Sequence, residues 1–464
     1  MVKRSEIDFT KGPLLKKLII YALPIIGVNL LQILFTATDV AMLGIFTNDM
    51  AVAAVGASAT IINLLLGFLL GMSVATNVLV ARAMGSKDKE HAGHLVGTSV
   101  ALSVVFGLVI TVVGILLSEK LLVWTNCDPE VLPYATKYLK IYLLGTPIIM
   151  LYNFCAAILR AVGDTLRPLL FLLMSGFANI ALNAFFILVL GWDVEGVAIA
   201  TVSSQALSAV FSLVLMVRND GYANLSISKI RLSRRELFGI LQIGVPMGIS
   251  KVSFSIANVV IYSRLNLLGA DVMAANAICK EIEGFMLEIM HGFSLAAIAI
   301  ISQNLGAKKM PRIKKTIMLS LLLTSVVGAS LGVGLFFTRE FFCGIMSDTQ
   351  IVIEYAAFRE AVVGCLYVIC GLANVFQESI RGLGYSNTSL AISITANIVF
   401  RIFWILVIYP LLAVEGDIMR NYLIICLVWP ISWAITALLG AVVLIFLYKK
   451  TKKRVAEASS ALAT

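Results

Sequence analysis

Charged residues are scarce in this sequence of 464 residues: Asp, Glu, Lys and Arg together make up 13%, whereas hydrophobic residues make up 60%. Soluble proteins carry about 25% charged residues, so the composition excludes an ordinary soluble protein. Apolar stretches of about 20 residues recur from Leu14 to Tyr448, and each is long enough to cross a bilayer as a helix. The strand-length alternation that a transmembrane barrel requires is missing. The sequence therefore predicts an all-α integral membrane protein.

Histidine and cysteine are also rare, with three and seven residues, respectively. The cysteines form no CxxC pair, and His91 and His94 lie far from His291 in the sequence. These spacings predict neither a disulfide framework nor a metal cluster. No Ser or Cys is accompanied by a His and an acid in the manner of a nucleophilic site, so an enzyme is not predicted and we expect no cofactor. Nothing resembles the selectivity filter of a channel.

The apolar stretches predict twelve transmembrane helices. The expected spans are 14–45, 51–80, 92–118, 131–160, 167–190, 195–217, 236–268, 272–304, 311–338, 351–381, 387–410 and 420–448. We expect an N-terminal lobe at 1–217, a basic linker at 218–235, a C-terminal lobe at 236–448 and a basic tail at 449–464.

The net charge of +10 comes from Lys and Arg dispersed over alternate connections between the spans. The basic connections include Lys3 and Arg4 at the N-terminus, the linker and the tail. By the positive-inside rule, both termini are expected in the cytoplasm, which agrees with an even number of spans. Dispersed charge of this kind does not predict nucleic-acid binding, but it suits contact with anionic membrane lipids.

Short motifs recur at an offset of about 220 residues. Ala22-Leu-Pro24 matches Gly244-Val-Pro246, 222 positions later, and Arg160-Ala-Val-Gly163 matches Arg381-Gly-Leu-Gly384, 221 positions later. Six spans in each half give both halves the same orientation, so we expect two six-helix lobes related by a pseudo-twofold axis along the membrane normal.

These motifs resemble the multidrug and toxic compound extrusion (MATE) family over nearly the whole chain. The resemblance rests on Pro24 and Asp39, on Arg160-Ala-Val-Gly-Asp164 and Asn179-Ile-Ala-Leu-Asn183, and on Gln303-Asn-Leu-Gly-Ala307. It implies an exporting antiporter driven by a proton or sodium gradient. The apolar part of the seventh span offers no carboxylate, so the chain resembles the DinF-like branch more than the NorM-like branch.

Asp39 is the leading candidate for ion coupling, because a carboxylate within an apolar helix is costly and is usually functional. Asn179 and Asn183 lie at i and i+4 on one helix face, and Thr201 could add a hydroxyl oxygen. The resemblance implies that these four residues bind sodium or a proton, although the family's archaeal members carry Asp at the position of Asn183. The alternatives are that Asp39 faces water at the outer interface and that the asparagines join helices.

Other polar residues within the spans have weaker assignments. Pro24 removes a backbone hydrogen bond, and the resemblance implies a conformational hinge there, with a static kink as the alternative. The candidate substrate-cavity residues are Gln32, Asn153, Glu288 and His291, for which plain helix packing or ion pairing is the alternative. Glu378 and Arg381, at i and i+3, are expected to form a structural ion pair, and Arg401 is expected to need a carboxylate partner.

The expected function is secondary active efflux of small organic compounds. Abundant Met and Phe predict a cavity for amphiphilic or cationic substrates, because flexible apolar walls adapt to varied shapes. A lipid-linked oligosaccharide flippase of the same superfamily is the alternative. We expect a monomer in a bacterial or archaeal cytoplasmic membrane, with no metal ion other than sodium.

Overall fold

The computed structural model describes residues 6–460, apart from the side chain of Ser459, so Lys3, Arg4 and the end of the basic tail lie outside the described residues. Within that range, every regular element is a helix, as predicted. Eleven helices are long and apolar enough to cross a membrane, and one bent pair gives a twelfth. The predicted class, an all-helical membrane protein, is confirmed.

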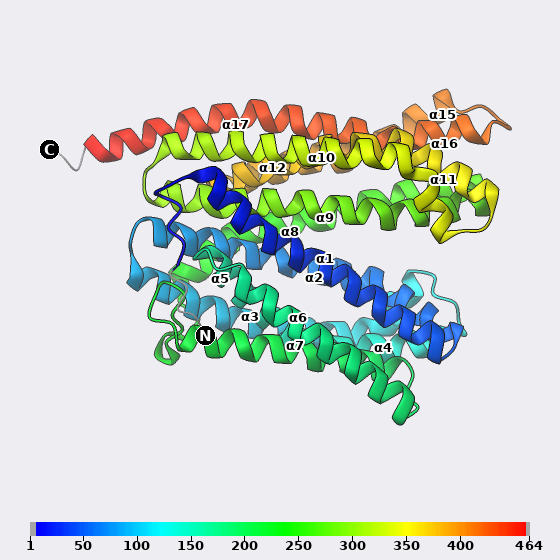
Figure 1. The fold of residues 1–464 in the computed structure, drawn as a ribbon, viewed down its shortest axis with the longest axis horizontal. Helices are drawn as coiled ribbons and strands as arrows, with labels where there is room; N and C mark the ends of the chain where they lie inside the picture. Colours follow the sequence, from blue (N-terminus) through cyan, green and yellow to red (C-terminus); the bar gives the residue numbers. More distant parts are fainter. Residues whose placement is uncertain (1–5, 461–464) are drawn as a thin grey trace. The chain divides into compact units, whose positions relative to one another are not determined.

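The described chain forms two compact units (Figure 1). The first unit combines the residues up to Lys11 with Gly27–Gly248. Its helices are the second part of α1 (Leu14–Phe46), α2 (Asp49–Gly85), α3 (Lys89–Trp124), α4 (Leu132–Leu144), α5 (Thr146–Ala161), α6 (Leu166–Ala184), α7 (Val194–Val217) and the first part of α8 (Arg234–Leu265).

The second unit combines Gly12–Ile26 with the chain from Ile249 onward. Its further helices are α9 (Ala270–Gly306), α10 (Met310–Met346), α11 (Gln350–Val362), α12 (Tyr367–Gly382), α13 (Ser386–Ser393), α14 (Phe400–Phe403), α15 (Tyr409–Leu412), α16 (Ile418–Cys426) and α17 (Val428–Ser460). The unit boundaries fall within α1 and α8 and not at the connection 218–235. The predicted lobes, linker and tail stay a prediction.

Three details of the helices differ from the predicted spans. The fourth span is bent by 49° between α4 and α5, next to Pro147, which lacks a backbone N–H donor and whose ring would clash with the carbonyl four residues earlier in a continuous helix. The tenth is interrupted by a 3₁₀ turn at Gly364–Leu366. The last helix does not end near residue 448 but continues through the basic segment to Ser460. Hydropathy identifies apolar segments long enough to span a membrane, but it does not detect local bends, interruptions or polar extensions of a helix.

The turns that follow equivalent helices repeat between the halves. Lys87 and Lys308, 221 positions apart, have φ values of 62° and 57°. Gly163 and Gly384, also 221 apart, have φ values of 87° and 96°. Positive φ is uncommon for a lysine, so its recurrence at one offset is strong structural support for the internal repeat.

The segment before α1 is held to the first unit by hydrogen bonds. Glu6 Oε1 accepts hydrogen bonds from the backbone N–H groups of Tyr222, at 2.6 Å, and Ala223, at 3.4 Å. The N–H of Ile7 donates to the carbonyl of Val162 at 3.0 Å. Burial raises the pKa of the Glu6 carboxyl, although the two backbone donors act in the opposite direction. Residues 6–11 therefore belong to the first unit, whereas the helix that follows them begins in the second.

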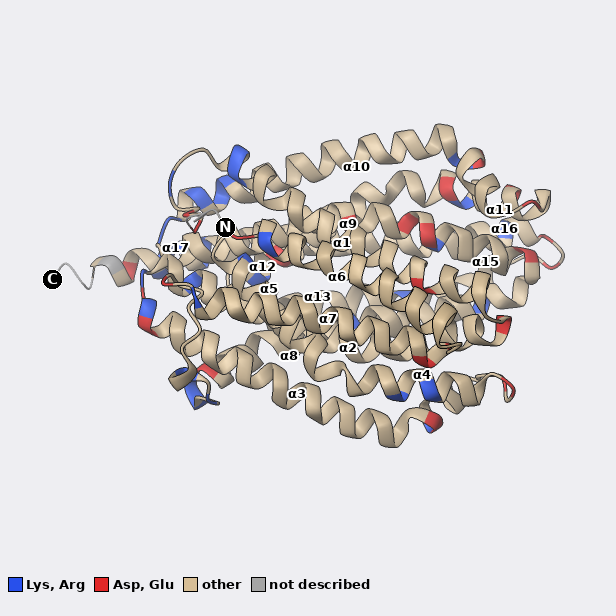
Figure 2. Ribbon diagram, turned by 60° about the horizontal axis from the view of Figure 1, so that its bottom comes forward, with Lys and Arg blue, Asp and Glu red and all other residues tan. Residues whose placement is uncertain are grey.

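Lys and Arg gather mainly at one end of the helices in each unit (Figure 2). In the first unit, this end carries the α2–α3 and α7–α8 connections, which hold Lys87 and Lys229, among others, and the first turn of α6, which holds Arg167. The alternation predicted from the sequence thus corresponds to a charged end of each helix bundle.

The first unit includes a close approach between α2 and α8. A Cβ on Gly71 would lie 2.4 Å from the backbone nitrogen of Gly248 and 2.7 Å from its Cα. Small residues of this kind let two membrane helices come together at backbone distance. Gly56, on the same helix, has nothing within 4 Å of its would-be Cβ.

Gly71→Ala is expected to destabilise the protein by about 1–3 kcal/mol, because the added methyl group collides with backbone atoms, which cannot rotate away. Gly56→Ala is the matched control and is expected to be neutral or to stabilise by up to about 1 kcal/mol, since alanine favours a helix. Thermal unfolding in detergent micelles measures both. Equal midpoints for the two variants would contradict the close approach.

Candidate functional site

Asp39 lies in the second part of α1 and is only 6% exposed. Its Oδ1 accepts a hydrogen bond from Asn183 Nδ2 of α6 at 2.6 Å. Its Oδ2 accepts one from Thr201 Oγ1 of α7 at 3.0 Å. Both carboxylate oxygens are thus held by neutral donors from two other helices. The burial of Asp39 within the protein argues against the alternative in which this carboxylate simply faces water.

The two asparagines of α6 complete a small polar network. Asn183 Nδ2 also lies 3.3 Å from Asn179 Oδ1, and Asn179 Nδ2 donates to Thr201 Oγ1 at 3.4 Å. Asn183 is fully buried, and its Oδ1 has no hydrogen-bond partner within residues 6–460. The chain enters a π-helical turn at Phe185, and such turns are frequent at functional sites. One carboxylate and several neutral oxygens can hold a proton or a hard monovalent cation.

Two tyrosines near this network were not predicted from the sequence. Tyr138 of α4 is buried and Tyr142 is partly buried, and both lie within electrostatic range of Asp39. Their ring centroids are 6.1 Å apart, as the i and i+4 spacing allows. That spacing is visible in the sequence, but the separation of about 100 residues from Asp39 gives no sign that the tyrosines lie in the same region of the fold.

The two cavity candidates from the first half, Gln32 and Asn153, form no hydrogen-bond network like that of Asp39 within the described residues. Gln32 is exposed, and Asn153 Nδ2 donates to the carbonyl of Ile149 in its own helix at 2.8 Å.

Pro24 lies inside α1, two residues before the unit boundary at Ile26. Its repeat counterpart Pro246 lies inside α8, two residues before the other boundary.

The second-half candidates belong to the second unit. His291 Nδ1 lies 3.7 Å from Glu288 Oε2 on α9. Arg381 Nη1 lies 2.5 Å from Glu378 Oε1 on α12, in the i and i+3 arrangement expected. Gln32 and Asn153 belong to the first unit, so the four cavity candidates do not fall within one unit.

An ion pair that the sequence analysis missed forms inside the second unit. Arg359 Nη2 lies 2.8 Å from Glu283 Oε2, and Arg359 Nε lies 3.0 Å from Glu283 Oε1. Tyr367 donates to Glu283 Oε2 at 3.2 Å, and Asn276 accepts from the guanidinium. The guanidinium also stacks over the Trp429 ring, 4.3 Å from its centroid.

Arg401 corrects an expectation. It is fully buried, but within residues 6–460 no carboxylate lies within ion-pair distance of its guanidinium. Its Nε donates to Ser432 Oγ at 3.0 Å and its Nη1 to Asn258 Oδ1 at 2.9 Å. The expected carboxylate is replaced by two neutral acceptors and by the Phe254 ring, whose centroid is 4.9 Å away. The sequence shows that charged residues are scarce in the spans, but it does not show whether Arg401 contacts a carboxylate or neutral acceptors.

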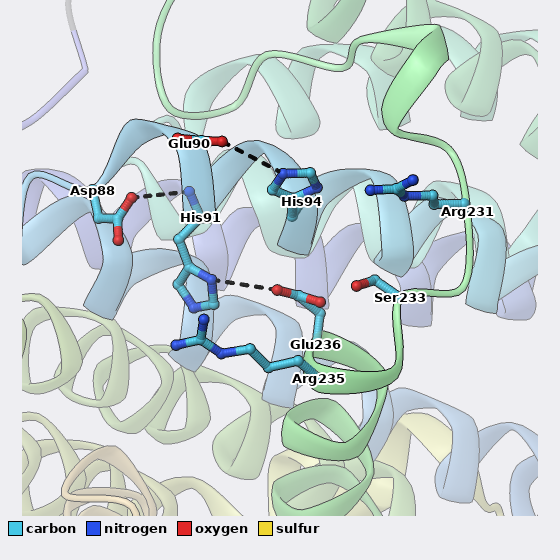
Figure 3. Close-up of a pocket in the computed structure, with 8 residues that line it drawn as sticks. All are labelled: Asp88, Glu90, His91, His94, Arg231, Ser233, Arg235 and Glu236. Atoms are coloured by element: carbon cyan, nitrogen blue, oxygen red, sulfur yellow. Dashed lines mark hydrogen bonds and ion pairs between the residues drawn. The ribbon is translucent and has the colours of Figure 1, made fainter.

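A polar pocket of about 390 Å³ lies at the basic end of the first unit (Figure 3). His91 Nδ1 at the start of α3 approaches Glu236 Oε1 of α8 to 3.6 Å. His94 Nε2 lies 4.0 Å from Glu90 Oε1. Glu236 is buried at 6% exposure, so this first-turn carboxylate is a further residue that the sequence analysis passed over.

The MatE family model matches the chain twice, at residues 24–185 and 246–407. The chain belongs to the MatE family. Both matches begin at a helix proline, and their offset of 222 residues is that of the internal repeat. This MATE protein is therefore a membrane transporter and not an enzyme.

Bacterial multidrug proteins are among the relatives of this chain. The chain is 27% identical over 299 residues to the probable multidrug resistance protein YpnP of Bacillus subtilis, covering 64% of this chain and 67% of that protein. It is 22% identical over 376 residues to the multidrug export protein MepA of Staphylococcus aureus strain N315, covering 81% and 83%, respectively.

Solved MATE structures share the fold. A multidrug resistance MATE family transporter of the MOP superfamily, in an outward-facing conformation, superposes with a TM-score of 0.88 at 20% sequence identity. The alignment covers 98% of this chain and all of that structure.

Proposed function

We propose that this MATE protein exports small amphiphilic organic compounds in exchange for protons or sodium ions. The observation that carries the proposal is the buried Asp39 carboxylate, whose two oxygens are held by Asn183 and Thr201. The names of the relatives, multidrug resistance and multidrug export proteins, support the substrate class.

Antiport requires that ion and substrate favour different conformations or compete for one, because a ligand with equal affinity for both states shifts neither. In the proposed cycle, a proton or sodium ion neutralises Asp39, and Asn179, Asn183 and Thr201 supply neutral oxygens around it. Loss of the ion restores a negative charge that attracts the cationic part of a substrate. Pro24 leaves a backbone carbonyl without its helical partner, which permits α1 to bend between its two parts.

The test is uptake of ethidium by inside-out proteoliposomes under an imposed proton gradient and, separately, an imposed sodium gradient. Uptake is expected under at least one gradient and to stop when that gradient is collapsed. The responding gradient identifies the coupling ion. Absence of uptake under both gradients, with correctly folded protein in the liposomes, would overturn the proposal.

We further propose a membrane location, an orientation of the termini and a branch of the family for this protein. The basic ends of the two units support a location with both termini in the cytoplasm, by the positive-inside rule. The bacterial relatives support a prokaryotic cytoplasmic membrane. We place the chain in the DinF-like branch and expect it to act as a monomer among anionic lipids.

A further inference from the structure

A second polar pocket, of about 110 Å³, lies inside the second unit. It is enclosed by α8, α9 and α12 and by the segment around Ser393. Lys251, His291, Asn374, Arg381 and the carboxylate Glu378, which is paired with Arg381, give it polar walls. The Phe254 ring contributes an apolar wall, so the pocket suits a ligand with a polar head and a hydrocarbon body.

Lys251 is the accessible cation of this pocket. Its side chain is exposed because it lines the pocket. Within residues 6–460 its ammonium group forms no ion pair within 4.0 Å. The carboxylates that act on it electrostatically, Glu288 and Glu378, approach other groups, His291 at 3.7 Å and Arg381 at 2.5 Å.

Arg401 adds positive charge beside the same pocket. Its guanidinium stacks on Phe254, which lines the pocket, and its hydrogen bonds go to the neutral side chains of Asn258 and Ser432. A buried charge without a counter-ion is unfavourable at low dielectric, and an anion nearby relieves it. Around Lys251 itself, Arg381 and the carboxylates Glu288 and Glu378 are the other charged groups, and Arg401 brings the formal sum of these five charges to one positive when His291 is neutral.

We propose that this pocket binds the carboxylate group of amphiphilic organic anions, with the Lys251 ammonium as its charge partner. Asn374 lies on the same wall, and its amide group is suited to hydrogen bonding of a carboxylate oxygen. Phe254 and Leu287 contact the first carbons of the ligand. The inference rests on the proposed export function and extends its substrates from cationic amphiphiles to organic carboxylates.

The test compares two probes that share one body, pyrenebutyrate and its trimethylammonium counterpart. Binding to the detergent-purified protein is measured by fluorescence polarisation. Lys251→Met is expected to weaken pyrenebutyrate binding about tenfold, as the loss of one charge-assisted contact predicts. It is expected to leave binding of the cationic probe unchanged or tighter. Lys251→Arg keeps the charge and is expected to bind pyrenebutyrate within about threefold of wild type.

Lys280→Met is the matched control, because Lys280 is an exposed lysine of the same unit that does not line the pocket. It is expected to bind both probes as the wild type does. Wild-type protein that fails to bind pyrenebutyrate, or a Lys251→Met variant that loses both probes equally, would overturn the inference.

A transport assay beside the binding assay distinguishes failure of this inference from failure of the proposed function. If wild-type proteoliposomes take up ethidium under a gradient and the protein shows no pyrenebutyrate binding, the carboxylate site fails and export stands. If pyrenebutyrate binds in a Lys251-dependent manner and no compound moves under either gradient, the site stands and the export proposal fails.

Discussion

Asp39→Asn is expected to lower gradient-driven export by at least about a hundredfold, near the upper end of typical coupling free energies. Asparagine has nearly the same shape and can remain within reach of Asn183 and Thr201, but it carries no exchangeable charge. The variant therefore imitates the neutralised form and has no means of sensing the ion gradient. Initial rates of ethidium uptake in proteoliposomes measure the effect, with thermal unfolding as the check on folding.

Two companion variants sharpen this result. Thr201→Val removes the hydrogen bond to Asp39 Oδ2 and keeps the carboxylate, so export is expected to persist at a reduced rate. Asn183→Asp puts a second carboxylate in place of the amide whose nitrogen lies 2.6 Å from Asp39 Oδ1, and it is expected to change the pH and sodium dependence of uptake. An Asp39→Asn protein that exports at the wild-type rate, with unchanged ion dependence, would show that coupling resides elsewhere.

Glu283→Gln is expected to reduce the free energy of unfolding by about 3–5 kcal/mol, the usual cost of removing one partner from a buried ion pair. Arg359 is 2% exposed, so its guanidinium would keep its charge and lose the carboxylate that compensates it. Removing both charges together, in Glu283→Met with Arg359→Met, is expected to recover part of the loss. The midpoint of thermal unfolding in detergent is the measurement.

Glu281→Gln provides the control, because Glu281 lies two residues earlier on the same helix and is exposed. Its midpoint is expected to stay near that of the wild type, since exposed charges contribute little to stability. If Glu283→Gln and Glu281→Gln unfolded at the same temperature, the Arg359 pair would not be an important source of stability.

The fold was predictable because its determinants are local or periodic. Apolar length gives the spans, and recurring short motifs give the repeat. The repeat extends even to single hydrogen bonds: Ser58 Oγ donates to the Ala135 carbonyl at 3.3 Å, and Cys279 Sγ to the Ala356 carbonyl at 3.4 Å, with both members shifted by 221 residues. Neither bond could be read from the motifs, because a serine and a cysteine do not match in sequence.

The candidate site was predictable in part. The i and i+4 spacing of Asn179 and Asn183 predicts their common face, and the family resemblance supplies the association with Asp39 and Thr201. The pairing of Glu283 with Arg359, 76 residues away, had no such signal. Long-range polar partners depend on packing between helices, and a single sequence records only which residues are charged. The neutral partners of Arg401 were missed for the same reason.

The positions of Pro24 and Pro246 bear on how the polypeptide can be divided. Each compact unit is completed by a helix segment from the opposite half of the sequence: Gly12–Ile26 completes the second unit, and the start of α8 completes the first. A break in the connection 218–235 would leave the first fragment without the beginning of α8 and the second without Gly12–Ile26. The two fragments would then have to be synthesised together and exchange these segments, much as domain-swapped subunits do.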